Sequence, residues 1–135
     1  MHRLFLDANV LFTAAHNPDG RAAFLFDSVS RGRWELLSSA FGIGEARRNI
    51  AAKYPQCITR LESLLVRLTV VGQPTAVRTA LALAEKDQPI YLAALSTQAT
   101  HLLTGDLRHF GPFMNRPRET GGMVIQTVAE FLASQ

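Results

Sequence analysis

The chain has 135 residues, of which 47% are hydrophobic and 19% charged, a composition that predicts one globular domain over residues 1–135 and excludes a disordered chain. No apolar run reaches the roughly 18 residues that a membrane-spanning helix needs, so we expect a cytoplasmic protein with no membrane contact. The single cysteine, Cys57, excludes an internal disulfide and cysteine-based metal sites.

Patterns typical of strands and helices alternate along the whole chain. The first half predicts, in chain order, a strand over 3–6, helices over 8–15 and 21–31, a strand over 33–37, a helix capped by Ser38 or Ser39 and running to about Lys53, and a helix over 56–67. The second half predicts a strand over 68–71, helices over about 74–86 and 90–99, a strand over 101–104, a loop, a strand over 123–126 and a terminal helix capped by Thr127.

This alternation predicts an α/β fold with a mainly parallel sheet. Ligands of open parallel sheets bind outside the carboxyl ends of the strands. Asp7 and Asp106 each stand directly after a predicted strand. We therefore expect these two carboxylates at the functional edge of the sheet.

Taken singly, the acidic residues have structural explanations. Asp7 and Asp87 could cap helices, Asp106 could lie in a turn, and Glu45 could lie on a solvated helix face. Together they predict more, because carboxylates that share one pocket repel one another strongly unless a cation neutralises them. Magnesium and manganese prefer oxygen ligands, and such ions support phosphodiester hydrolysis. The combination therefore predicts a Mg²⁺ or Mn²⁺ site.

Several segments resemble motifs of the PIN-domain nucleases, in the right order and over essentially the whole chain. They are Leu-Asp-Ala-Asn-Val-Leu at 6–11, Glu-Ala-Arg-Arg-Asn at 45–49, Lys-Asp-Gln-Pro-Ile at 86–90 with Ala93 and Ala94, Leu-Thr-Gly-Asp at 103–106 with His109 and Phe110, and the closing segment 124–132. The resemblance implies a three-layer α/β/α domain with about five strands, and metal-dependent cleavage of RNA, usually within the strand. Many small single-domain members resemble VapC-type toxins, which are commonly homodimers neutralised by an antitoxin protein.

The same resemblance assigns roles to individual residues. Asp7, Asp87 and Asp106 would hold the metal directly or through water, and Glu45 would bind metal or orient the attacking water. Asn9 and Thr104 would hold the carboxylates by hydrogen bonds. Gly42 and Gly44 depart from a good helix pattern just before Glu45, so either the helix begins later or a backbone approaches closely.

Charge elsewhere in the chain favours a polyanionic substrate. Assigning four of the eleven acids to the site leaves seven against fourteen basic residues, so the remaining surface is strongly positive. Arginines near the acidic segments are candidate phosphate contacts, with ordinary solubility or antitoxin contact as the alternative: Arg47, Arg48, Arg108, Arg116 and Arg118.

Other functions remain to be weighed. A haloacid-dehalogenase-type phosphatase needs an aspartate where Asn9 stands, and a receiver domain needs a lysine after a late strand, where Thr104-Gly-Asp106 stands instead. A catalytically silent PIN-like domain that binds RNA or a partner stays open, as does a housekeeping nuclease. His109, three residues after Asp106, could approach a substrate, whereas His101 is expected to be a semi-buried strand residue.

Overall fold

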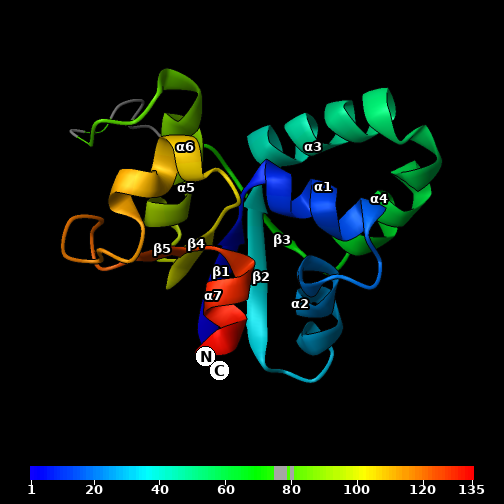
Figure 1. Ribbon diagram of the computed structural model, residues 1–135, viewed down its shortest axis with the longest axis horizontal. Helices are drawn as coiled ribbons and strands as arrows, with labels where there is room; N and C mark the ends of the chain where they lie inside the picture. Colours follow the sequence, from blue (N-terminus) through cyan, green and yellow to red (C-terminus); the bar gives the residue numbers. More distant parts are fainter. Residues whose placement is uncertain (75–78, 80) are drawn as a thin grey trace.

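A parallel sheet forms the centre of the molecule, as the sequence predicts. The computed structural model describes residues 1–74, 79 and 81–135, and within them five strands pair in the order β3-β2-β1-β4-β5 (Figure 1). The strands are β1 (His2–Leu6), β2 (Trp34–Ser39), β3 (Thr69–Val71), β4 (His101–Leu103) and β5 (Val124–Gln126). Every neighbouring pair is parallel, so the carboxyl ends of all these strands meet at one edge.

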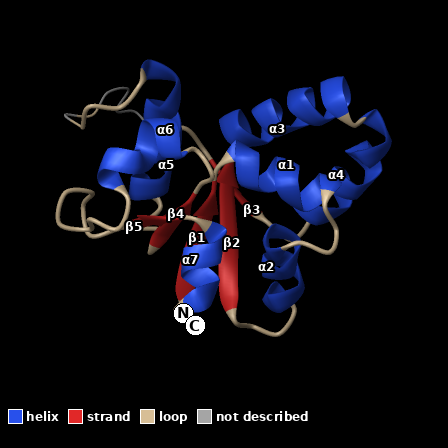
Figure 2. Cartoon of the chain, viewed as in Figure 1, coloured by secondary structure: helices blue, strands red, loops and turns tan. Residues whose placement is uncertain are grey.

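Helices cover both faces of this sheet (Figure 2). They are α1 (Ala8–His16), α2 (Arg21–Val29), α3 (Ala40–Lys53), α4 (Ile58–Leu65), α5 (Gln88–Ser96), α6 (Leu107–Phe110) and α7 (Val128–Ala133). Short 3₁₀ turns lie at Pro55–Cys57, Glu85–Asp87 and Gly111–Phe113. In the described part of the chain, no helix combines the length and the apolar character needed to cross a bilayer.

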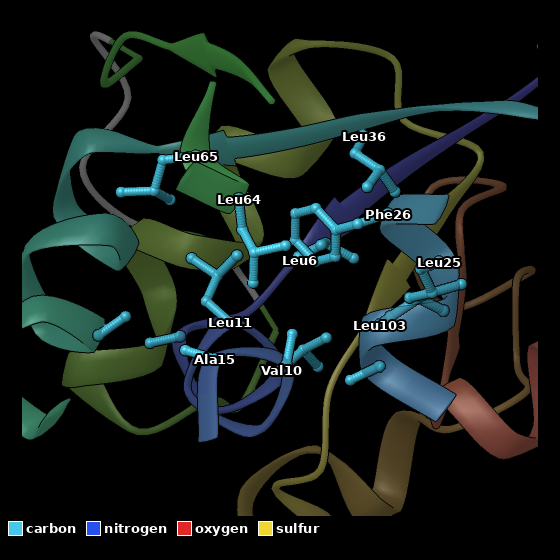
Figure 3. Close-up of a cluster of buried hydrophobic side chains, with 14 of the residues drawn as sticks. Leu6, Val10, Leu11, Ala15, Leu25, Phe26, Leu36, Leu64, Leu65 and Leu103 are labelled. Carbon is cyan, nitrogen blue, oxygen red and sulfur yellow. The ribbon is translucent and has the colours of Figure 1, made fainter. Parts of the chain in front are cut away.

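Two hydrophobic cores separate the layers. Successive strand residues point to opposite faces of a sheet, so Leu4 and Leu6 of β1 enter one core while Phe5, between them, enters the other. The first core packs the sheet against α1–α4 and α7, and Figure 3 shows part of it. The second packs the opposite face against α5 and α6. The fold is thus the expected three-layer α/β/α arrangement.

The helix that carries Glu45 begins directly after β2. Strand β2 runs two residues further than predicted, so Ser38 lies in the strand and donates a hydrogen bond to the Leu6 carbonyl, at 2.9 Å. Ser39 caps α3, and its hydroxyl accepts from the Gly42 amide at 3.1 Å. Helix α3 therefore begins before both glycines, and the late start considered for it is wrong.

A close approach explains Gly42. A Cβ atom there would lie 3.2 Å from Ile90 Cδ1 of α5 and 3.3 Å from Ser38 Oγ. A Cβ atom on Gly44 would meet only Arg48 Nη1, at 3.4 Å. Close packing of α3 against α5 therefore accounts for Gly42, whereas nothing in the structure explains Gly44.

Two further predictions about the second half need correction. The helix predicted over 74–86 falls partly on 75–78 and 80, outside the described residues, and residues 81–84 are not helical. Leu81 and Leu83 alternate at a spacing of two and both face the second core, which suits extended backbone. The segment after Asp106, predicted as a loop, contains the short helix α6, whose first turn the Asp106 side chain caps.

Candidate active site

The four predicted acids line one cleft at the carboxyl edge of the sheet. Strands β2 and β3 lie on one side of β1, and β4 and β5 on the other, so the order of the strands reverses between β1 and β4. Such a reversal opens a crevice in parallel sheets, since the helices that follow the two strands diverge. The cleft here has a volume of about 1060 Å³, and its lining includes Asp7, Glu45, Asp87 and Asp106.

Asp7 is the most enclosed of these acids. It follows β1, caps α1, and is only 4% exposed. Its Oδ1 accepts a hydrogen bond from the Ala8 amide at 2.8 Å. Its Oδ2 accepts from Thr104 Oγ1 at 2.8 Å and from Asn9 Nδ2 at 3.1 Å. Three donors thus hold the carboxylate in one orientation.

Thr104 and Asn9 join the two strands that carry Asp7 and Asp106. Thr104 follows β4 and is fully buried, and its hydroxyl also accepts from the Asp106 amide at 3.0 Å. Asn9 Oδ1 accepts from the Gly105 amide at 2.7 Å. Because both side chains contact both segments, they fix the spacing of the two aspartates. That they support metal ligands stays a prediction of the motif resemblance.

The acids raise one another's pKa values, as expected for carboxylates that share a cleft. Burial raises the pKa of Asp7 to about 6, even though its hydrogen bonds from Thr104 and Ala8 act in the opposite direction, and the charges of Asp87 and Glu45 raise it further. Burial also raises the pKa of Asp87, with smaller upward contributions from Asp106 and Glu45. Ionising the cluster is therefore costly without a compensating cation.

His109 forms part of this cluster. Its Nδ1 lies 2.7 Å from Asp106 Oδ2, and since a carboxylate oxygen only accepts, the ring nitrogen donates. Burial would raise the pKa of Asp106, but the side-chain and backbone hydrogen bonds from His109 outweigh it and lower that pKa. The same Nδ1 is 3.4 Å from Asp87 Oδ2. In the sequence, the signal for this position was its spacing of three residues from Asp106.

The residues present fit a divalent cation. Asp87 is 7% exposed, and its buried Oδ2 accepts no hydrogen bond from any described residue. Asp87, Asp106 and His109 each offer a ligand atom, and these atoms lie within 4.8 Å of one another. Carboxylate oxygen is the donor that Mg²⁺ and Mn²⁺ prefer. A buried acceptor without a donor, beside further carboxylates, is what such an ion would satisfy.

Helix α3 directs one face into the cleft. Glu45, Asn49 and Lys53 all line it, at the spacing of four residues that places side chains on the same side of a helix. Glu45 is thus at the site, as predicted, although it enters from a helix and not from the end of a strand. Helical spacing from Glu45 was the signal in the sequence that could have identified Asn49 and Lys53.

The predicted arginines lie elsewhere, since none of the five is among the residues that line the cleft. Arg47 forms a paired contact with Glu62 of α4 through two 2.8 Å hydrogen bonds, and Arg116 lies 3.6 Å from Glu119. Contact of these arginines with a longer substrate stays a prediction. Among the described residues, the lysines and arginines that line the cleft are instead Arg21, Lys53 and Lys86.

Comparison with known proteins agrees with this architecture. The family model described as PIN domain matches residues 3–108, which is most of the chain and includes all four acids. The chain therefore belongs to the PIN-domain family, as the motif resemblance predicts. No curated protein gives a significant sequence match.

Solved structures share the fold at low sequence identity. VapBC2 from Rickettsia felis, bound to a promoter DNA fragment, is 15% identical with a TM-score of 0.68, over 93% of this chain and 98% of the other. VapBC-1 from nontypeable Haemophilus influenzae is 19% identical with a TM-score of 0.62, over 94% and 98%. VapC20 of Mycobacterium tuberculosis, described as a toxin that cleaves the sarcin-ricin loop, is 7% identical with a TM-score of 0.54, over 73% and 86%.

Proposed function

We propose that the protein is a ribonuclease that depends on Mg²⁺ or Mn²⁺ and hydrolyses phosphodiester bonds within RNA. The observation that carries the proposal is the convergence of four carboxylates in one cleft, at the point where the strand order reverses. Neither membership of the PIN family nor the fold alone names a substrate. The excess of basic residues over the acids outside the site favours a polyanion.

Each acid has a role that its surroundings suit. Asp7, Asp87 and Asp106 would hold the ion, which supplies charge stabilisation at the phosphoryl oxygen and an acidified water. Glu45, which lines the cleft from α3, would bind metal or orient the attacking water. Asn9 and Thr104 hold Asp7 in place by hydrogen bonds. His109 holds Asp106 in the same way, and such supporting contacts commonly affect metal affinity or activity by 10–100-fold.

The decisive experiment measures cleavage of labelled single-stranded RNA with Mg²⁺, with Mn²⁺ and with EDTA. We expect cleavage with either ion and none with EDTA. Asp7→Asn and Asp106→Asn should each remove most of the activity while the circular dichroism spectrum stays that of the folded protein. Full activity in either folded variant would contradict the assigned site. Absence of cleavage by wild-type protein with both ions would favour the silent, RNA-binding or partner-binding alternative.

The more specific proposal is that this nuclease is the toxin of a toxin–antitoxin pair. It rests on the fold shared with VapBC complexes and with FitAB, which is 18% identical with a TM-score of 0.59 over 93% of this chain and 94% of the other. In this role we expect a homodimer in solution and a small antitoxin protein encoded by the adjacent gene. Expression without that protein should arrest bacterial growth, and co-expression should restore it. Normal growth in both cases would favour a housekeeping nuclease.

A further inference from the structure

One end of the cleft, away from Asp106, combines aromatic rings with a cation. Phe12 of α1 and Lys53 of α3 both line the cleft, and Lys53 Nζ lies 5.8 Å from the centre of the Phe12 ring. The rings of His16 and Tyr54 complete the group, which we call the aromatic end. Ring centres are 4.5 Å apart for His16 and Tyr54, 5.5 Å for Phe12 and His16, and 5.7 Å for Phe12 and Tyr54.

Two helices connect the aromatic end to the acids. Helix α1 begins at Asp7 and carries Phe12 and His16 toward its other end. Helix α3 carries Glu45 and, eight residues later, Lys53, a separation of about 12 Å along the helix axis. Even a stacked strand has a phosphate every 3.4 Å or so. The aromatic end is therefore too far away to act on the phosphate at the acids, but it can reach a nucleotide a few positions along the strand.

The positive charges of Lys53 and Arg21, which both line the cleft, are not neutralised by ion pairs. Within the described residues, neither has a carboxylate within 4.0 Å, in contrast to Arg47, which is held by Glu62. Both side chains are exposed. Asp19 also lines the cleft and reduces its positive potential without pairing with either residue. Lys53, beside the accessible rings, is therefore available to a ligand, and Arg21 adds a second free cation to the cleft.

We propose that the aromatic end is a subsite for a nucleotide a few positions from the cleaved bond of single-stranded RNA. This inference rests on the proposed ribonuclease function and specifies how the substrate is held. The base of that nucleotide stacks on the ring cluster, and Lys53 contacts its phosphate. Stacking on aromatic side chains together with a cationic groove is how proteins hold unpaired strands with little sequence preference. The subsite requires an unpaired nucleotide, since a base inside a duplex has no free face to stack.

The test measures RNA binding without cleavage. In the Asp106→Asn background, we would titrate a fluorescein-labelled single-stranded oligoribonucleotide and follow anisotropy at several salt concentrations. Lys53→Gln should weaken binding by about 3–10-fold and lower the slope of log K against log salt by about 0.7. Phe12→Leu, which keeps apolar contact with the core, should weaken binding by about 10-fold with the slope unchanged.

Matched variants serve as controls. Arg31→Gln removes the same charge from an exposed residue in the turn before β2, at the opposite end of the sheet, and Phe24→Leu removes an exposed ring of α2 outside the cleft. Both should bind RNA like the background protein. In otherwise wild-type, active protein, Lys53→Gln should raise KM for a long RNA with little change in kcat. Equal affinities for Lys53→Gln, Phe12→Leu and the two controls would overturn the proposal.

Two other outcomes separate this inference from the function on which it rests. If wild-type protein cleaves RNA but Lys53→Gln leaves both affinity and KM unchanged, the nuclease stands and the subsite is wrong. A second outcome is that the Asp106→Asn protein does not bind RNA, while the Lys53 and Phe12 variants no longer bind the protein encoded by the adjacent gene. In that case the aromatic end is a partner interface and the subsite is also wrong. If the Lys53 and Phe12 variants bind RNA more weakly as expected, but the wild-type protein does not cleave RNA, the subsite is supported and the catalytic proposal fails.

Discussion

Thr104 donates a 2.8 Å hydrogen bond to Asp7, and this contact joins the residue that follows β4 to the residue that follows β1. The hydroxyl is fully buried and also accepts from the Asp106 amide. One side chain thus sets the position of two proposed metal ligands.

Replacing Thr104 with valine should therefore affect both stability and metal binding. Valine keeps the shape but leaves the Asp106 amide and the Asp7 carboxylate each without one partner, which costs about 1–3 kcal/mol. Loss of this bond should also weaken metal affinity by about 10-fold or more. Urea denaturation and calorimetric titration with Mn²⁺ measure the two effects. Thr104→Ser, which keeps the hydroxyl, is the control, and a similar loss in both variants would contradict this account.

The raised pKa of Asp7 predicts a pH dependence of stability in protein freed of metal by EDTA. Below its unfolded pKa of 3.8 the carboxyl is neutral in both states, and its stabilising effect is lost as the pH rises through the folded pKa of about 6. The contribution of Asp7 to the free energy of unfolding should fall by about 3 kcal/mol over this interval. The free energy of unfolding of the wild-type protein relative to Asp7→Asn should fall by this amount, as measured by urea denaturation of both proteins at several pH values.

His101 should have the opposite effect on the pH dependence of stability. Burial, and the neighbouring His2, lower the pKa of His101 to about 4, so the folded state favours the neutral ring. Its stabilising effect is present above the unfolded pKa of 6.5 and is lost as the pH falls through about 4. Between about pH 4 and 6.5, the stability of the Asp7→Asn variant should therefore rise with pH relative to that of Asp7→Asn with His101→Gln, in which the raised pKa of Asp87 still acts in the opposite direction. Equal slopes in the two variants would contradict this account of His101.

Replacing the two glycines of α3 with alanine should change the stability of the protein in opposite directions. Gly44→Ala meets only the end of a flexible arginine, so it should stabilise the protein by about 0.5–1 kcal/mol through helix propensity. Gly42→Ala gains the same propensity but forces a Cβ against Ile90 and the buried Ser38, and such overpacking costs about 1–3 kcal/mol. Thermal denaturation of the two variants compares them directly. A higher melting temperature for Gly42→Ala than for Gly44→Ala would contradict the packing explanation.

The regular features of the fold could be predicted because each has a local pattern. Asp7 and Asp106 follow apolar runs, and parallel strands bring their carboxyl ends together, so their meeting in one cleft follows from the pattern of the chain. The helix predicted up to Lys86 was wrong at residues 81–84, because tertiary contacts hold Leu81 and Leu83 against the core in extended backbone.

The basic residues of the site were harder to predict. Arg47 is two positions after Glu45 and therefore points to another side of α3. Arg48, three positions after Glu45, is its neighbour on the helix surface, yet it is not among the residues that line the cleft. Only the direction of α3 relative to the cleft decides which cation faces the acids, and that direction depends on packing against α5 and on Gly42. Composition therefore predicted that positive charge is present but not where it lies.

The distance along the chain between Asp7 and Thr104 has a consequence for synthesis. They are 97 positions apart, and β1 lies between β2, which follows it closely, and β4, which is made much later. In a chain emerging from the ribosome, β1 can pair with β2 early. Asp7 and Asp106 can come together only after β4 has been synthesised and has paired with β1. The proposed nuclease would thus remain inactive while it is being translated, close to the ribosomal and messenger RNA around it.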